Sequence, residues 1–302
     1  MNVTTKRYHI LDEIRGITLC SMILYHAVWD LVYMFGYDWN WYQSDFAYLW
    51  QQSICWCLIL LSGFCFSLGK RKWRRGLIVF GAGTLVTLVT HLLMPEQKVR
   101  FGVLTMLGVS MLLMALSEKI IELLFDDKKR NRAWKYMGLG VSMLLFFLTR
   151  EINNHNLGFE DFRLWRLPDS VYLRSDFMTF LGFTKSGFYS TDYFSLMPWF
   201  FLFAVGYFLY QIAKEMGWLV KVLTTEQTFT KQQRMFTFRN LFSFMGKHSL
   251  IIYMLHQPLI YGFLFMLEMI LLRNYPVFLS LCRISSVWAP APIRSGRSHT
   301  AI

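Results

Sequence analysis

The chain has 302 residues, of which 55% are hydrophobic, 18% aromatic and only 17% charged, and its formal net charge is +12. This composition excludes a disordered or fibrous protein. A soluble domain is typically about a quarter charged, so the composition is unusual for one, and the blocks of apolar residues predict a polytopic membrane protein. In a soluble protein the positive charge would suggest nucleic-acid binding. In a membrane protein an excess of Lys and Arg usually reflects topology, so no nucleic-acid partner is expected.

Seven segments are apolar enough to be membrane spans, since a spanning helix needs roughly 20 mostly apolar residues to cross about 30 Å of hydrocarbon. They cover about residues 10–35, 46–69, 75–94, 101–123, 134–149, 193–213 and 247–272. The fifth segment is short. The sequence therefore predicts an all-α fold, a polytopic membrane helical bundle with about seven transmembrane helices embedded in the lipid bilayer.

Lys and Arg gather at the amino terminus and in three connections, at residues 70–75, 126–132 and 214–246. Because basic residues are retained on the cytoplasmic side, the amino terminus is predicted to be cytoplasmic. The connection of residues 150–191 then lies outside. It is either a functional loop, such as a lid or binding rim, or a solvated linker with a short amphipathic helix. Residues 283–302 lack periodicity and predict a disordered tail after a membrane domain of residues 1–282.

The first segment contains four ionisable side chains, Asp12, Arg15, His26 and Asp30. Such residues are costly in a membrane and normally face a bundle interior or a cavity. At 100° per residue all four lie within an arc of about 60°, and Arg15 and His26 are three turns, or about 16 Å, apart along the helix. One stripe of the helix therefore carries polar groups from near one membrane surface to deep within the bilayer.

This spacing suits a reaction whose two reactants arrive from opposite sides of the membrane. Arg15 can hold a phosphate-bearing donor through its guanidinium group, while His26 can remove a proton from an acceptor. Asp30 follows one turn later and is expected to orient the His26 ring, and Asp12 is expected to pair with Arg15. The alternative is an interfacial Asp12–Arg15 pair with His26 as a core histidine. Four ionisable residues on one stripe favour a functional site.

Three further residues are weaker candidates for lining a cavity. His91 ends the third segment, where a capping or interfacial role is equally plausible, and Asp192 precedes the sixth segment. His256 is followed by Gln257 and Pro258, a pattern that fits either a cavity wall or an ordinary helix break. The sequence has no cluster of metal-ligand residues and no glycine-rich phosphate loop, so no metal is expected.

Four stretches follow one another along the chain: LDEIRGITLCSMILYHAVWDL at residues 11–31, FGVLTMLGVSMLL at 101–113, DYFSLMPWFFLFAVGYFL at 192–209 and GKHSLIIYMLHQP at 246–258. In this order they resemble the heparan-alpha-glucosaminide N-acetyltransferase catalytic-domain family, whose bacterial members begin with a similar D-x-x-R-G, an apolar run and H-A-x-W-D. Arg15 and His26 are also similar to the Arg, ten residues, His pattern of the related acyltransferase-three membrane enzymes.

The resemblance implies transfer of an acetyl group from cytoplasmic acetyl-coenzyme A to an amino or hydroxyl group of a sugar on the outer face. His26 would be the catalytic histidine, acting as a general base or as a transient acetyl carrier. Arg15 would be the donor-side or helix-organising arginine, with Asp12 and Asp30 as its motif neighbours. The large extra-membrane domain of the animal enzyme is missing, which favours a bacterial envelope glycan, or another small polar acceptor, and the bacterial inner membrane. The alternatives are a non-catalytic permease or exporter of a small polar molecule and a structural membrane subunit, and the oligomeric state is open.

Overall fold

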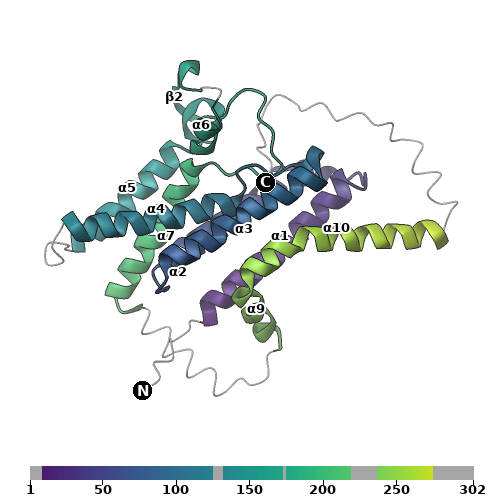
Figure 1. Ribbon diagram of the computed structural model, residues 1–302, viewed down its shortest axis with the longest axis horizontal. Helices are drawn as coiled ribbons and strands as arrows, with labels where there is room; N and C mark the ends of the chain where they lie inside the picture. The colour runs from purple at the N-terminus through teal and green to yellow at the C-terminus, as the bar shows by residue number, and fades with distance from the viewer. Residues whose placement is uncertain (1–8, 125–131, 173–174, 219–236, 275–302) are drawn as a thin grey trace. The chain divides into compact units, whose positions relative to one another are not determined.

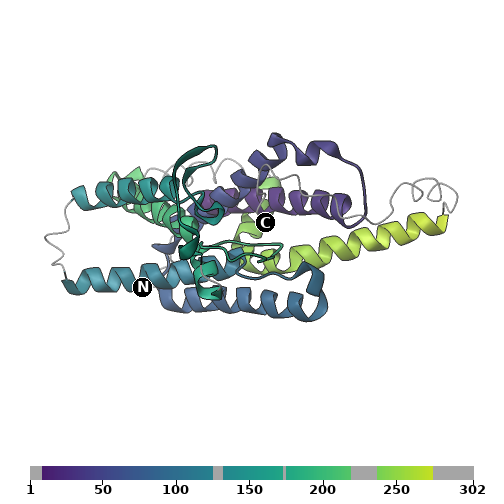
Figure 2. The same cartoon turned by 90° about the horizontal axis from the view of Figure 1, so that it is seen from above.

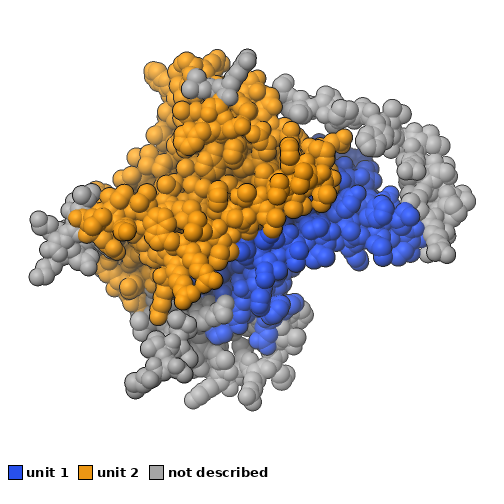
Figure 3. Space-filling model, viewed as in Figure 1, with its two compact units in different colours: residues 1–57, 234–297 blue, residues 58–233, 298–302 orange. Residues whose placement is uncertain are grey.

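The computed structural model describes residues 9–124, 132–172, 175–218 and 237–274. The chain divides into two compact units (Figure 3). Unit 1 comprises residues 1–57 and 234–297, and unit 2 comprises residues 58–233 and 298–302. The predicted tail of residues 283–302 lies outside the described residues.

Helices make up most of both units (Figure 1). The elements are α1 (His9–Tyr33), η1 (Asn40–Gln43), α2 (Asp45–Phe66), α3 (Lys72–Leu93), η2 (Pro95–Gln97), α4 (Val103–Leu124), α5 (Arg132–Leu148), η4 (Ile152–Asn154), β1 (Asn156–Phe159), β2 (Phe162–Arg166), η5 (Asp169–Val171), α6 (Asp176–Leu181), α7 (Leu196–Glu215), α9 (Thr237–Lys247) and α10 (Ser249–Asn274). Six helices, α1, α2, α3, α4, α7 and α10, are long and apolar enough to cross a membrane.

The predicted helical membrane bundle is confirmed, with a difference in the number of candidate spans. The fifth predicted segment does form a helix, α5, but this helix has 17 residues, fewer than the roughly 20 that a spanning helix needs. Among the residues that the structure describes there are therefore six candidate spans, against the seven predicted segments.

In unit 1, α1 packs against α9 and α10. Two glycines allow α1 and α9 to approach closely. A Cβ atom added to Gly16 would lie 2.0 Å from the Phe242 carbonyl oxygen, and one added to Gly246 would lie 1.9 Å from the Asp12 carbonyl oxygen. Small residues permit this kind of close helix packing in membranes. The contact fixes the amino-terminal half of α1, which carries Asp12 and Arg15.

Unit 2 is built from two helix pairs, α3 with α4 and α5 with α7, and α4 also contacts α7. The first pair lies side by side in both views (Figures 1 and 2). Glycines again set the distance: a Cβ atom on Gly83 would lie 2.5 Å from the Thr105 nitrogen, and one on Gly108 would lie 2.5 Å from the Phe80 nitrogen. Phe66, Phe203 and Met106 are among the most buried side chains of this unit.

The connection between α5 and α7 contains an antiparallel hairpin, in which Asn156 of β1 pairs with Arg166 of β2. A bulge follows Leu157, where Gly158 adopts a φ of 143° that favours glycine. The hairpin was not predicted, because two strands of four and five residues are too short to give a periodic signal. The short helix considered for this connection is present as α6.

Candidate functional site

The stripe of ionisable residues on α1 begins with an ion pair. Arg15 Nη1 lies 3.6 Å from Asp12 Oδ1, and Asp12 is buried. The two residues are three positions apart on the helix and therefore share a face. The predicted pairing of Asp12 with Arg15 is thus present, and it holds the guanidinium group at the amino-terminal end of the stripe.

Three turns further along α1, the ring of His26 faces the ring of His256 on α10. The ring centroids are 4.9 Å apart and the planes meet edge to face at 60°. His256 is buried and His26 is partly buried. The packing of α1 against α10 brings the two rings together. His256, a weaker candidate in the sequence, is therefore in ring contact with His26, the principal candidate.

Asp30 is held by Gln257, the residue after His256. Gln257 Nε2 donates a hydrogen bond of 2.8 Å to Asp30 Oδ1, and Asp30 is only 1% exposed. The sequence predicted that Asp30 would orient His26. In the described part of the chain no hydrogen bond joins these two residues, because α10 supplies an amide donor to the carboxylate in place of the imidazole.

Three buried atoms of this cluster have no hydrogen-bond partner among the described residues: Asp30 Oδ2, Gln257 Oε1 and His256 Nε2. His256 Nδ1 lies 2.5 Å from the Tyr253 carbonyl oxygen. A carbonyl oxygen can only accept, so in the neutral ring the proton belongs on Nδ1 and Nε2 is an acceptor. The Gln257 amide nitrogen is already engaged with Asp30, so the free end of this side chain is also an acceptor. The cluster therefore contains three buried acceptors that have no hydrogen-bond donor among the described residues.

Aromatic side chains pack beside this cluster in unit 1. The centroid of the Tyr25 ring lies 5.1 Å from that of Tyr42 and 5.2 Å from that of Trp50. Trp50 Nε1 donates a 2.7 Å hydrogen bond to Ser21 Oγ. Burial raises the pKa of the Tyr42 phenol well above its usual range, so its hydroxyl stays protonated. No sequence motif pointed to these residues, although aromatic side chains are frequent at residues 37–42.

His91 and Asp192 belong to unit 2. His91 is exposed in the last turn of α3 and makes no hydrogen bond or ion pair with the described residues. Asp192 Oδ2 accepts a 3.2 Å hydrogen bond from the backbone N–H of Val103, the first residue of α4. Burial raises the pKa of Asp192 to about 6, against the opposing effect of the Val103 hydrogen bond. Asp192 therefore caps a helix.

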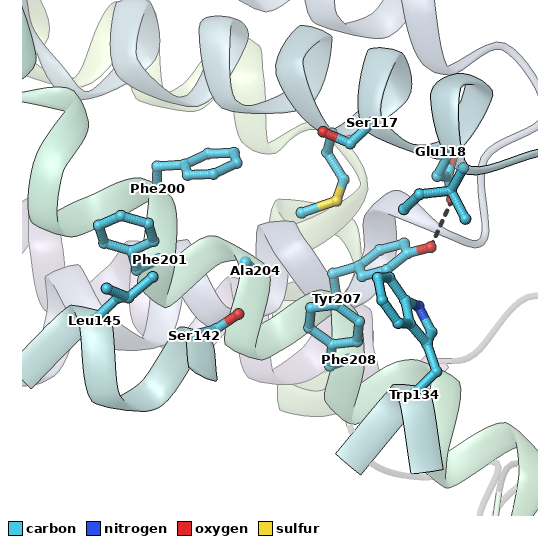
Figure 4. A pocket seen from close by; sticks show the side chains of 12 residues that line it. Ser117, Glu118, Trp134, Ser142, Leu145, Phe200, Phe201, Ala204, Tyr207 and Phe208 are labelled. Atoms are coloured by element: carbon cyan, nitrogen blue, oxygen red, sulfur yellow. Dashed lines mark hydrogen bonds between the residues drawn. The ribbon is translucent and has the colours of Figure 1, made fainter. Parts of the chain in front are cut away.

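Unit 2 also contains an ion pair that the sequence analysis missed. Lys72 Nζ contacts both carboxylate oxygens of Glu118, at 2.7 and 2.6 Å, and Tyr207 Oη donates to Glu118 Oε1 at 3.0 Å. Glu118 and Tyr207 line a cavity of about 200 Å³ between α4, α5 and α7, whose other walls include Trp134 and Phe200 (Figure 4). Glu118 is one of two acids in the apolar fourth segment, with Glu122, and this was the signal available in the sequence.

A protein-family model described as "Heparan-alpha-glucosaminide N-acetyltransferase, catalytic" matches residues 7–258. No curated protein and no solved structure matches the chain. The matched range covers most of the chain, and Asp12, Arg15, His26, Asp30 and His256 all lie within it.

Proposed function

Because the chain belongs to the heparan-alpha-glucosaminide N-acetyltransferase catalytic family, and is therefore a multi-pass, acetyl-coenzyme A-dependent membrane acetyltransferase, we propose that it acetylates the amino group of a glucosamine-type sugar at the His26–His256 pair. Family membership favours this enzyme over the permease alternative. The observation that carries the proposal is the cluster of three unpartnered acceptors beside two facing imidazole rings.

The choice of an amine over a hydroxyl group rests on the chemistry of these acceptors. Asp30 Oδ2, Gln257 Oε1 and His256 Nε2 each accept hydrogen bonds. A sugar ammonium group supplies three N–H donors, whereas a hydroxyl group supplies one. A buried acceptor without a partner costs about 1–3 kcal/mol. A protonated amino sugar therefore satisfies the cluster better than an unmodified hydroxyl sugar does.

Direct transfer then needs one base. His26 takes one proton from the bound ammonium group, and the neutral amine nitrogen then attacks the thioester carbonyl carbon of acetyl-coenzyme A. As the carbon–sulfur bond breaks and the amide bond forms, the nitrogen loses a second proton, which passes to the departing coenzyme A thiolate. Asp30 and Gln257 hold the amine during the attack. His26 acts in this scheme as a general base, and no acetyl-histidine intermediate is required.

Arg15 is assigned to the donor. It lies three turns from His26 on the same stripe, about 16 Å along the helix axis, and its ion pair with Asp12 positions the guanidinium group for a phosphate of coenzyme A. The basic residues of the amino terminus and of the run at residues 70–75 support a cytoplasmic donor side. The acceptor, a bacterial envelope glycan or a related small amino sugar, then enters from the outer face of the inner membrane.

The proposal is tested with purified protein in liposomes, radiolabelled acetyl-coenzyme A and glucosamine. Release of free thiol and transfer of label to the sugar are measured for the wild type, for His26→Ala and for the matched control His91→Ala, which alters an exposed histidine of unit 2. We expect both signals to fall at least 100-fold in His26→Ala and to be unchanged in the control. Equal thiol release by the wild type and His26→Ala would refute the assignment of the base. Label on the protein but not on the sugar would replace direct transfer by an acetyl-histidine mechanism.

A further inference from the structure

The basic run at residues 70–75 divides into two groups by the direction of its side chains. Lys72 turns inward and pairs with Glu118 at 2.6 Å, and Arg75 Nη1 donates to the Cys65 carbonyl oxygen at 3.3 Å. Arg71 and Arg74 are exposed, and neither makes an ion pair or a side-chain hydrogen bond with any residue that the structure describes. Two guanidinium groups, three residues apart in the sequence, therefore have no counter-charge among the residues that the structure describes.

These two arginines lie at the start of an apolar stripe on α3. Arg71 is the N-cap residue directly before the helix, and Arg74 lies in its first turn; at 100° per residue, Lys72 lies about 160° from Arg74 around the helix axis. Exposed aliphatic side chains continue the same stripe along the helix: Leu77, Ile78, Leu85, Leu88, Val89 and Leu92. The helix buries only 11% of its most apolar stretch within the structure, so this face is available to lipid.

A notch interrupts the stripe at Gly81. A Cβ atom added there would meet nothing within 4 Å, and Ile78 and Leu85 stand one turn before and after it. Trp73, 46% exposed, lies at the arginine end of the helix. Exposed tryptophans concentrate at the membrane–water interface, which places Arg71 and Arg74 at the depth of the lipid headgroups.

We propose that the outward face of α3 binds an anionic phospholipid. The headgroup phosphate lies between Arg71 and Arg74, since guanidinium groups form paired, charge-assisted hydrogen bonds with phosphate oxygens. An acyl chain follows the stripe and fills the notch at Gly81. The two arginine charges, which have no partner among the described residues, select an anionic lipid, because a zwitterionic headgroup carries its own ammonium group. This site is separate from the acceptor cluster of α1 and α10.

The test measures energy transfer from the protein's tryptophans to acyl-labelled dansyl phosphatidylglycerol and to the matching phosphatidylcholine, in detergent. A juxtamembrane basic residue contributes a factor of about five to binding of anionic lipid. Arg71→Gln/Arg74→Gln is therefore expected to raise the apparent Kd for phosphatidylglycerol about 25-fold and to leave phosphatidylcholine unchanged. The matched control, Arg163→Gln/Arg166→Gln, removes two exposed arginines from β2 of the same unit and is expected to change neither. Equal weakening by both double variants would overturn the proposal, and acetyltransferase activity with glucosamine verifies that each variant is folded.

Three further arms separate the source of the phosphate, the position of the chain and a protein partner. Displacement of labelled lipid from the wild type by free coenzyme A would assign the arginines to the donor and overturn the lipid site. Gly81→Leu is expected to weaken binding of long-chain phosphatidylglycerol but not of a dihexanoyl form; equal weakening of both would refute the placement of the acyl chain. Absence of lipid binding together with cross-linking of Leu85→Cys between two copies would make the stripe a protein interface.

Discussion

The hydrogen bond between Gln257 and Asp30 gives a quantitative test of the site in unit 1. Gln257→Leu removes the only described donor to a carboxylate that is 1% exposed. Both oxygens of Asp30 then lack a partner, and one of the three acceptors proposed for the amine is also lost. We therefore expect the substitution to reduce both stability and catalysis.

The size of the stability loss follows from the charge of the acceptor. A hydrogen bond to a charged group contributes about 1.5–3 kcal/mol, so Gln257→Leu is expected to lower the free energy of unfolding by about 2–3 kcal/mol. Gln211→Leu is a matched control, because Gln211 Nε2 donates to a neutral acceptor, Ser67 Oγ, at 3.3 Å. A neutral hydrogen bond contributes about 1 kcal/mol, so the control should cost less and leave activity unchanged.

The assay is denaturation of detergent-purified protein followed by tryptophan fluorescence, together with kcat/KM for glucosamine. Loss of one acceptor contact is expected to lower kcat/KM about 10- to 100-fold, since about 1.4 kcal/mol corresponds to a factor of ten. In a double-mutant cycle, the loss of unfolding free energy caused by Gln257→Leu should be at least about 1 kcal/mol smaller in the Asp30→Asn background than in the wild type. Additive effects of the two substitutions, or equal effects of Gln257→Leu and Gln211→Leu, would refute the role given to this hydrogen bond.

Two further predictions concern backbone packing and pH. Gly246→Val should destabilise unit 1 by at least about 3 kcal/mol, within the range of severe packing defects, because even a Cβ atom would lie 1.9 Å from the Asp12 carbonyl oxygen. Gly262→Val controls for loss of a helical glycine in the same unit, because Gly262 is exposed and an added Cβ atom would meet nothing within 4 Å. A melting temperature for Gly246→Val equal to that of wild type would contradict the close approach of α1 and α9. Burial raises the pKa of Asp192 from 3.8 to about 6, so the folded state holds its proton more tightly than the unfolded state. The resulting stabilisation is complete below pH 3.8 and is lost as the pH rises through 6, by up to about 3 kcal/mol. Asp192→Asn should remove this dependence from melting curves between pH 4 and 7, and an unchanged slope would count against it.

The periodicity of the first segment was sufficient to predict the polar stripe, because side chains three and four positions apart share a face of any regular helix. The Asp12–Arg15 contact follows from that rule alone. The contact of His26 with His256 does not follow from helical periodicity, since hydropathy identifies spans but does not specify which spans pack together. Gly16 and Gly246 determine the contact of α1 with α9, and α10 follows directly after α9. Small residues at both positions were the signal available in the sequence.

Asp192 illustrates a different limit. In the sequence it is a carboxylate at the start of an apolar segment, which is compatible with a cavity. In the structure it accepts from the first N–H of α4, which is 89 residues earlier in the chain. A Cβ atom on Gly102 would lie 2.6 Å from Asp192 Oδ2, so the glycine admits the carboxylate to the helix end. A cap supplied from so distant a segment leaves no local pattern, unlike a capping box.

Hydrogen-bond satisfaction distinguishes the two polar clusters of this chain more clearly than charge does. Glu118 accepts hydrogen bonds from Lys72 and Tyr207, so its charge is compensated. Removal of the Glu118 side chain would mainly affect stability. Asp30, Gln257 and His256 each retain an unpartnered acceptor among the described residues, and such groups cost about 1–3 kcal/mol each when buried. A single unpartnered oxygen, such as Asp192 Oδ1, is expected in a carboxylate whose other oxygen caps a helix. Three unpartnered acceptors on adjoining side chains of two packed helices are better explained by a shared ligand, and the amine of the proposed sugar acceptor has the donors that they lack.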